Sequence, residues 1–263
     1  MPAGGSHSAC IRQPHPPKER TARLPPRHRR EACPVSDGVK AAEFFALPPS
    51  LAVFAAQFSP DAHPWEWLRQ IGPALAAADF SGGQSLPPGI HAEGPVFVHP
   101  SAQLPAYATL IGPVWIGPET KLLPGCYLRG NVIVGARCTV GHNAELKNTL
   151  LMDRVQAPHR PYIGDSILGN GAHLGAGAVL SNLRLDQQPI TVRLPSGTCE
   201  TGLRKFGAIL GDAAEVGCNA VLQPGTLLGP RALVMPTMAF GGHLPAATIA
   251  RVRAQLSTFS RRD

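Results

Sequence analysis

The chain has 263 residues, of which 28 are glycine and 28 proline, and its formal net charge is +7. Because glycine and proline destabilise helix interiors, this composition excludes a helical bundle or a long coiled coil, and a hydrophobic content of 44% excludes global disorder. No apolar run reaches the roughly 18 residues of a membrane-spanning helix, and no secretory segment opens the chain. We therefore expect a cytoplasmic protein that does not associate with membranes.

The first 40 residues form a basic segment. They contain eight Lys or Arg against three Asp or Glu, so this segment carries +5 of the +7 net charge. Prolines at positions 14, 16, 17, 25 and 26 add to a composition that is typical of a disordered leader. No aromatic residue is interleaved with the charges to stack on bases, so nucleic-acid binding is not expected.

A helix is predicted between Pro64 and Ala78. Pro64 suits the first turn, and Trp65, Leu68, Ile71 and Leu75 fall on one face at helical spacing. We expect residues 41–93 to form a helical N-terminal cap of the domain that follows.

An aliphatic residue or methionine then recurs every six positions. The series runs through Val98, Leu104, Leu110, Ile116, Leu122, Leu128, Val134, Val140, Leu146 and Met152. Two further blocks continue the spacing in new phases, Tyr162 to Leu180 and Leu210 to Phe240. A period of six fits neither an amphipathic helix nor a simple strand, and repeats are the signature of solenoid folds.

The hexapeptide repeat predicts short strands joined by turns, with one large aliphatic side chain pointing inward on each strand. Three such strands close a coil of about 18 residues. Residues 94–242 are therefore predicted to form an all-β solenoid, a parallel β-helix, in which Cys126 and Cys138 fill the core. Residues 243–263 should close the stack with a helix over Ala246–Thr258.

The repeat is interrupted twice. Ten residues separate Met152 from Tyr162, which predicts that four residues are added around Gln156–His159. Thirty separate Leu180 from Leu210, and the intervening 182–206 segment has the pattern of an extruded β-hairpin. Because loops that leave a rigid solenoid commonly carry function, we expect the chemistry at these interruptions.

The residues around the interruptions carry a family resemblance over about half the chain. The matching strings begin with Glu145-Leu-Lys147-Asn, Pro158-His159-Arg-Pro-Tyr162-Ile-Gly164-Asp165 and Leu174-Gly-Ala176-Gly, and continue with 181–186 and 202–212. They resemble the left-handed β-helix acyltransferase domain of bifunctional N-acetylglucosamine-1-phosphate uridyltransferase/glucosamine-1-phosphate acetyltransferase. They are similar also to the archaeal sugar-1-phosphate nucleotidyltransferase/acetyltransferases.

This resemblance implies a role for His159 and for two cations. His159 falls on the family's general base, which takes a proton from the sugar amine as the amine attacks the acetyl-CoA thioester. Imidazole suits this task because its ordinary pKa of about 6.5 lies near working pH. Arg129 and Lys147 fall on the cations that hold the sugar phosphate, a group that favours paired basic partners.

Further contacts follow from the same resemblance. Tyr162 and Asn182 match polar contacts to the sugar, and Lys205 matches a basic contact from the extruded loop. Ala176 matches the backbone position that meets the acyl group of acetyl-CoA. The family assembles as trimers, so the resemblance implies a homotrimer with sites between chains and the 182–206 loop reaching towards the neighbour.

The sequence departs from the family pattern at two points. His173 occupies a position where the uridyltransferases usually carry Asn, which affects how the sugar would be oriented. Nothing N-terminal resembles the Gly-rich nucleotide-binding signature of the nucleotidyltransferase half. Synthesis of sugar nucleotides is therefore not expected.

The favoured hypothesis is an acetyl-CoA-dependent acyltransferase of an amino sugar, a hexosamine 1-phosphate. Attack is expected to be direct, without an acyl-enzyme, because no Ser or Cys nucleophile adjoins His159. We also expect that acyl transfer requires no metal. One alternative is a non-catalytic trimeric scaffold or regulatory subunit, and another is an acyltransferase acting on a nucleotide-linked sugar or an amino acid. A zinc site on His99, His142 and His173, as in carbonic anhydrases of this fold, does not have the required spacing.

Overall fold

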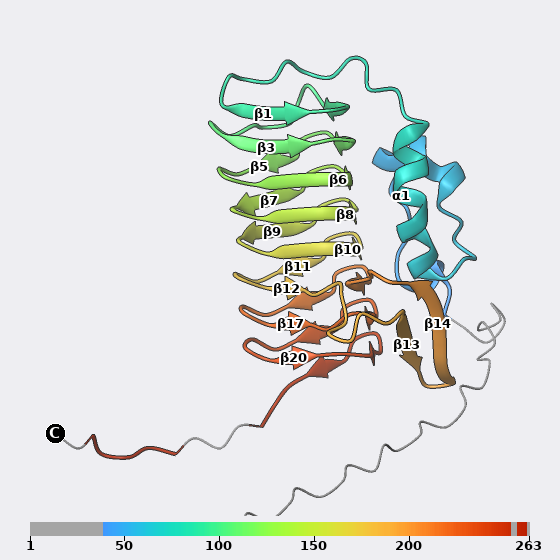
Figure 1. Ribbon diagram of the computed structural model, residues 1–263, viewed down its shortest axis with the longest axis vertical. Helices are drawn as coiled ribbons and strands as arrows, with labels where there is room; N and C mark the ends of the chain where they lie inside the picture. Colours follow the sequence, from blue (N-terminus) through green and yellow to red (C-terminus); the bar gives the residue numbers. More distant parts are fainter. Residues whose placement is uncertain (1–38, 254–256, 262–263) are drawn as a thin grey trace, which may run out of the picture. The chain divides into compact units, whose positions relative to one another are not determined.

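The computed structural model describes residues 39–253 and 257–261, so almost all of the predicted 1–40 leader lies outside the described residues. All of the described residues belong to one compact unit. This unit is a parallel β-solenoid of about nine turns, with few helices (Figure 1). Among the described helices, none has the length and apolar character needed to cross a membrane.

The solenoid has three faces, and each coil contributes a strand or part of a strand to each face, except that the first coil has only the bridge residue Gln103 on the third. The first face contains β1 (Ile90–Glu93), β3 (Ala108–Ile111), the first halves of β6 (Tyr127–Val134), β8 (Glu145–Leu151) and β10 (Tyr162–Leu168), then β12 (Val179–Leu180), β17 (Val221–Leu222) and β20 (Ala239–Phe240). The second contains β2 (Val96–Val98), β4 (Val114–Ile116), the second halves of β6, β8 and β10, then β15 (Ala208–Leu210), β18 (Thr226–Leu228) and β21 (His243–Leu244). The third contains β5 (Lys121–Leu122), β7 (Thr139–His142), β9 (Gln156–His159), β11 (His173–Leu174), β16 (Glu215–Val216), β19 (Leu233–Val234) and β22 (Ile249–Ala250).

The hexapeptide residues form the core as predicted. Paired strands place Leu110, Leu128 and Leu146 directly above one another on the first face, and all three are fully buried. Cys126 and Cys138 lie in the same core and are about 1% exposed. Parallel pairing of this kind saturates the strand edges of every internal coil.

The predicted insertion near His159 is wrong. Ile163, not Tyr162, pairs with Leu146 and fills the core, while Tyr162 lies on the outside of the first face. The phase changes because core residues are five positions apart instead of six on two sides of the solenoid, from Leu146 to Leu151 and from Ile163 to Leu168. In each, one left-handed residue makes the turn between the first and second faces: Asn148 (φ 50°) or Asp165 (φ 44°). The coil above uses two residues there, Gly130 and Asn131, and the strand register shifts accordingly.

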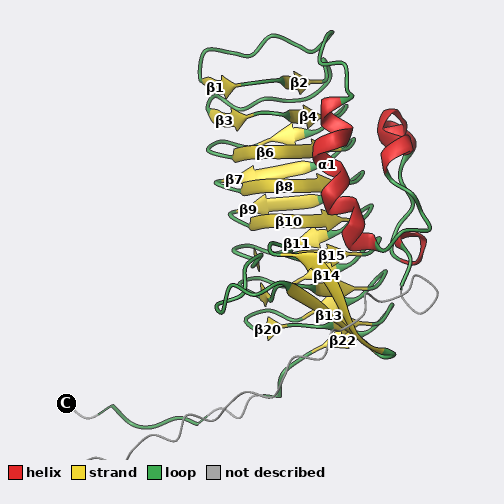
Figure 2. Ribbon diagram, turned by 45° about the vertical axis from the view of Figure 1, so that its right-hand side comes forward, coloured by secondary structure: helices red, strands yellow, loops and turns green. Residues whose placement is uncertain are grey.

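The N-terminal helices cover a side of the solenoid and do not cap its end. Three 3-10 helices, η2 (Ala41–Glu43), η3 (Pro49–Gln57) and η4 (Pro64–Glu66), precede α1 (Trp67–Ala76), which confirms the predicted helix. Figure 2 shows α1 crossing β6, β8 and β10. Its buried side chains, including Ile71, pack on Ile133, Leu150 and Ile167 of the second face. We predicted that these helices cap an end of the solenoid. They lie on the second face instead, because the outer surface of that face is apolar and has to be covered.

The predicted hairpin is confirmed as β13 (Ile190–Leu194) paired antiparallel with β14 (Gly197–Leu203). It leaves the solenoid at the turn between the first and second faces, after β12, and returns at β15. Its buried residues Ile190, Val192 and Leu194 join the cluster around α1, and Arg69 of α1 donates a hydrogen bond to the carbonyl of Thr201 at 2.9 Å. The hairpin strands thus pack against the chain's own N-terminal helices.

The solenoid also extends beyond its predicted limits. It begins at β1, before residue 94, and β21 and β22 continue it to Ala250. The predicted closing helix over 246–258 is therefore wrong for residues 246–253, where Ile249 pairs with Leu233 as a strand; residues 254–256 lie outside the described part. Pro245 and the left-handed Ala247 (φ 53°) explain the extended path.

Candidate functional site

Three of the predicted substrate contacts lie on the outer surface of the first face. Arg129 in β6 pairs with Lys147 in β8, and Lys147 pairs with Gly164 in β10. Tyr162 begins β10 and pairs with Glu145 of the neighbouring strand. Because side chains alternate along a strand, these positions all point away from the core.

A nearly buried carboxylate, Asp165, joins the predicted residues together. Lys147 Nζ donates hydrogen bonds to both carboxylate oxygens, at 2.8 and 3.0 Å. The side-chain amides of Asn148 and Asn182 donate to the same carboxylate at 3.0 and 2.5 Å. We call Lys147, Asn148, Asp165 and Asn182 the Asp165 cluster. The cluster links β8 and β10 to the start of the 182–206 excursion.

Arg129 has its own carboxylate partner. Its Nη2 and Nε lie 2.7 and 2.9 Å from Glu145 Oε1, and its guanidinium lies 5.7 Å from the centroid of the Tyr127 ring. The hydrogen bond to Glu145 raises the pKa of Arg129, which therefore stays cationic. The two predicted cations are thus held side by side, each against a carboxylate.

The hydroxyl of Tyr162 stays protonated in this site. Burial raises the pKa of its hydroxyl, and the negative charges of Glu145 and Asp165 raise it further. Because Gly164 has no side chain, the side chains of Tyr162 and Asn182 can both lie against it. A Cβ at position 164 would be only 2.6 Å from Asn182 Nδ2 and 2.7 Å from Tyr162 Oη. Any side chain at 164 would therefore displace the site residues.

His159 and Ala176 lie at the turn where the third face meets the first. His159 ends β9 and is exposed, and its carbonyl accepts a hydrogen bond from Gly177 N at 2.8 Å. Ala176 thus lies one coil below His159, and its own carbonyl accepts from Asn219 N at 2.8 Å. Tyr162 follows His159 by three residues, a span of at most about 11 Å between Cα atoms. The base candidate therefore borders the face that carries the cations.

Lys205 is not part of the same network. It is exposed near the end of the excursion, and its side chain has no hydrogen bond or ion pair within the part of the chain that the structure describes. His173 lies exposed on the third face, where it pairs with Gln156 and Glu215. No three His, Cys, Asp or Glu side chains among the described residues come together as a metal site.

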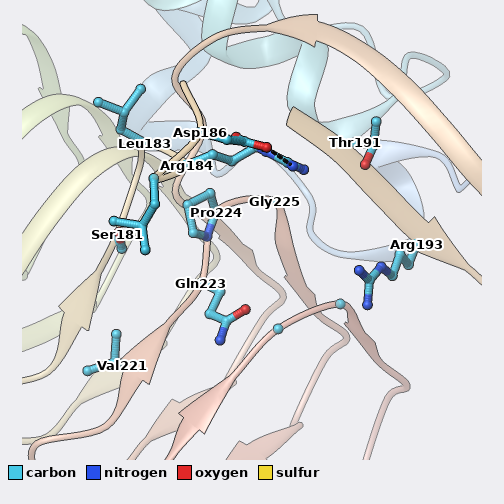
Figure 3. A pocket seen from close by; sticks show the side chains of 13 residues that line it. Ser181, Leu183, Arg184, Asp186, Thr191, Arg193, Val221, Gln223, Pro224 and Gly225 are labelled. Carbon is cyan, nitrogen blue, oxygen red and sulfur yellow. Dashed lines mark hydrogen bonds and ion pairs between the residues drawn. The ribbon is translucent and has the colours of Figure 1, made fainter. Parts of the chain in front are cut away.

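Sequence reasoning missed the roles of Asp165 and Glu145, although both lie within the quoted motifs. The sequence signal for Asp165 was an aspartate directly after a glycine. Aspartate is one of the few residue types that readily adopt the left-handed conformation found there. A second missed feature is a cavity of about 850 Å³ at the turns between the first and second faces, bounded by the 183–186 loop, β13 and the solenoid (Figure 3).

Comparisons with known proteins agree with this architecture. The GMPPB C-terminal domain family matches residues 110–238. A "Bifunctional protein GlmU" of Methanococcus vannielii is 34% identical over 111 residues, which are 42% of this chain and 27% of the relative. A "Bifunctional sugar-1-phosphate nucleotidylyltransferase/acetyltransferase" of Sulfurisphaera tokodaii is 32% identical over 113 residues, 43% of this chain and 28% of the relative. The chain thus spans only about a quarter of the length of these archaeal relatives.

A "Putative uncharacterized acetyltransferase YaiX" of Escherichia coli is 31% identical over 155 residues, which cover 52% of this chain and 67% of that protein. The hexapeptide coils and these matches together show that the protein is a transferase of the hexapeptide-repeat class. The chain belongs to the left-handed β-helix acyltransferase family, with a domain like the C-terminal domains of GMPPB and GlmU.

Proposed function

We propose that this protein transfers the acetyl group of acetyl-CoA to the amino group of a hexosamine 1-phosphate. One observation carries the proposal: Arg129, Lys147, Tyr162 and Asn182 share a single surface, and His159 and Ala176 border it. The names of the relatives, which include acetyltransferases of sugar phosphates, support the reaction class.

The two cations would bind the phosphate. A phosphate dianion prefers two or more charged donors, and arginine can give it two parallel hydrogen bonds. Here Glu145 and Asp165 hold Arg129 and Lys147 in place before the substrate arrives. A phosphate could then bind the donors that remain on each cation, and the enzyme would lose little side-chain entropy on binding.

His159 would act as the general base. It removes a proton from the sugar ammonium or from the attacking amine, the amine nitrogen bonds to the thioester carbonyl carbon, and the C–S bond breaks. The proton on His159 can then pass to the departing thiolate, so that free CoA leaves with its thiol. Ala176, one coil below, would lie against the acyl group, and attack would be direct, without an acyl-enzyme.

The test is a thiol-release assay with acetyl-CoA and glucosamine 1-phosphate. Wild-type protein should release CoA in step with acetylated sugar, and His159→Ala should reduce kcat by about 10²- to 10⁴-fold. His91→Ala is the matched control, because His91 is an exposed histidine of the first coil and belongs to no part of the site. An inactive wild type, or a fully active His159→Ala, would contradict the proposal.

One observation favours a second candidate, a non-catalytic scaffold or regulatory subunit. Both cations are already neutralised by carboxylates, as expected where charges only stabilise a solenoid surface. A scaffold would bind neither acetyl-CoA nor the sugar phosphate in calorimetry, whereas the enzyme would bind both.

A further inference from the structure

The N-terminal helices and the 182–206 excursion meet at a contact that the proposed acetyl transfer does not use. Figure 1 shows the hairpin of β13 and β14 directly below α1. Arg69 of α1 donates a hydrogen bond from Nη2 to the carbonyl of Thr201 in β14, at 2.9 Å. This bond joins residues 132 positions apart in the chain, and it ties the excursion to an element that precedes the solenoid.

The guanidinium of Arg69 lies directly against the backbone of β14. Gly202 permits this approach, because a Cβ at position 202 would lie only 2.9 Å from Arg69 Nη2. Glu66 is a much weaker partner of the same guanidinium. The two charged groups are 3.9 Å apart, and their side chains are 45% and 42% exposed, so this ion pair contributes little. The hydrogen bond to Thr201 is therefore the specific contact of Arg69.

Thr201 connects Arg69 to the base of the hairpin. Its side chain is buried, and its Oγ1 donates to the carbonyl of Ile190 at 2.6 Å and accepts from Leu203 N at 3.1 Å. Ile190 and Leu203 are paired where the two hairpin strands begin and end. A displacement of Thr201 would thus disturb both strands close to the solenoid.

The excursion begins and ends at residues of the candidate site. Asn182, at its start, donates to the carboxylate of Asp165. Gly207 N, directly after its end, donates to the carbonyl of Asp165 at 2.8 Å. Lys205 follows Thr201 by four residues, a span of at most about 14 Å between Cα atoms. The position of the hairpin therefore limits where Asn182 and Lys205 can lie.

We propose that Arg69 is a positioning residue for the acceptor: it holds the hairpin on α1 and so keeps Asn182 and Lys205 in place to bind the sugar phosphate. This inference rests on the proposed function. The N-terminal helices are then part of the framework of the acceptor site as well as the cover of the second face. His159 and Ala176 lie outside the excursion, so the chemical step and acetyl-CoA binding should not depend on Arg69.

Steady-state kinetics of variants at position 69 test the proposal. Arg69→Met keeps an apolar stem but removes the hydrogen-bond donors, so the acceptor KM should rise at least fivefold. Both kcat and the KM for acetyl-CoA should change less than twofold. Arg69→Lys keeps a cationic donor and should raise the acceptor KM less than Arg69→Met does.

Two controls isolate the hydrogen bond to Thr201. Glu66→Gln removes only the weak ion pair of Arg69, and Arg251→Met removes an exposed arginine that follows the last strand, β22. Both variants should have the kinetics of the wild type. An unchanged acceptor KM in Arg69→Met, or a fall in kcat as large as the rise in KM, would overturn the proposal.

Hydrogen exchange separates this inference from the proposed function, because it needs no substrate. The amides of Leu203, Phe206 and Gly207 donate the hydrogen bonds that close the excursion. In Arg69→Met they should exchange at least five times faster than in the wild type, while the amides of the solenoid core strands keep their rates. Faster exchange in a protein that does not acetylate hexosamine 1-phosphates would overturn the proposed function and support the positioning of the excursion. Equal exchange in both proteins would overturn the role of Arg69, whatever the activity.

Discussion

Asp165 is the residue on which the geometry of the candidate site depends most. Its carboxylate accepts hydrogen bonds from Lys147, Asn148 and Asn182, and its carbonyl accepts one from Gly207 N at 2.8 Å. It therefore fixes the Lys147 cation, the Asn148 turn of the coil above, and both ends of the 182–206 excursion. We infer that it is a positioning residue, since it acts through Lys147 and Asn182.

Replacing Asp165 should weaken acceptor binding more than it slows chemistry. Asn tolerates the left-handed conformation of residue 165 and keeps one acceptor oxygen, so Asp165→Asn should fold but leave Lys147 without its charge partner. We expect the acceptor KM to rise about tenfold, with kcat and the KM for acetyl-CoA changed less than threefold. Steady-state kinetics with each substrate varied would check this, and a fall confined to kcat would contradict it.

The buried thiols of Cys126 and Cys138 should make the stability of the protein depend on pH. Burial raises the pKa of Cys126 and of Cys138 to about 12, whereas an unfolded thiol titrates near 8.5. Above that pH the unfolded chain releases protons that the folded chain retains. The stabilisation is therefore complete below about pH 8.5 and is lost as the pH rises towards 12.

At pH 10 the loss should be about 2 kcal/mol for each thiol. Denaturant titrations at pH 8 and pH 10 would measure it, with Cys126→Ala/Cys138→Ala as the comparison. The double variant should be less stable at pH 8, because it removes core volume, but should lose less stability between the two pH values. An equal loss in both proteins would show that these thiols do not titrate as their burial requires.

At the scale of elements, sequence reasoning succeeded where one local pattern decides the structure. The six-residue period specified the strands because each coil repeats the same inward contact, as Leu110, Leu128 and Leu146 show. The amphipathic face of α1 and the hairpin signal of 182–206 were likewise sufficient. Each pattern is set by residues close together in the chain.

Prediction failed where a single turn residue, or a contact between distant residues, decides the structure. The five-residue sides at Asn148 and Asp165 depend on single left-handed turns, which a count of apolar positions interprets as an insertion. The position of α1 depends on the apolar outer side chains of the second face, such as Ile133 and Leu150. The Asp165 cluster joins three separated segments, so its geometry could not be derived from spacing alone.

The packing of α1 on the second face should contribute strongly to stability. Ile71 is fully buried between α1 and the solenoid, so Ile71→Ala should cost about 2–5 kcal/mol of unfolding free energy. Val53→Ala is the control in a neighbouring helix, because Val53 is 59% exposed and its loss should cost about 0.5 kcal/mol or less. Chemical denaturation would measure both, and similar values for the two variants would mean that the helices do not pack here in solution.

At the scale of the whole molecule, the free surfaces favour self-association. The N-terminal helices cover the second face. Exposed apolar side chains remain on the first and third faces and the turn between them: Tyr107, Tyr127, Val221, Met235 and Ile249. Such residues are typical of an interface, and the turn between these faces carries His159 and Ala176.

We therefore propose that the protein is a homotrimer in which these apolar side chains are buried between chains. Light scattering after size exclusion should give a mass three times the 27.7 kDa of the chain. Met235→Glu/Ile249→Glu should shift the protein towards the monomer, whereas Val53→Glu, on the helix-covered side, should not. A wild-type mass of one chain would contradict this assembly.

A crystal structure with CoA and glucosamine 1-phosphate bound would test the proposed active site most directly. The phosphate should lie within hydrogen-bonding distance, about 3 Å, of Lys147 Nζ and Arg129. The sugar nitrogen should lie beside the His159 imidazole, and the CoA sulfur beside Ala176, of one protomer in the assembly. A phosphate bound away from both cations, or an imidazole remote from the amine in every protomer, would contradict it.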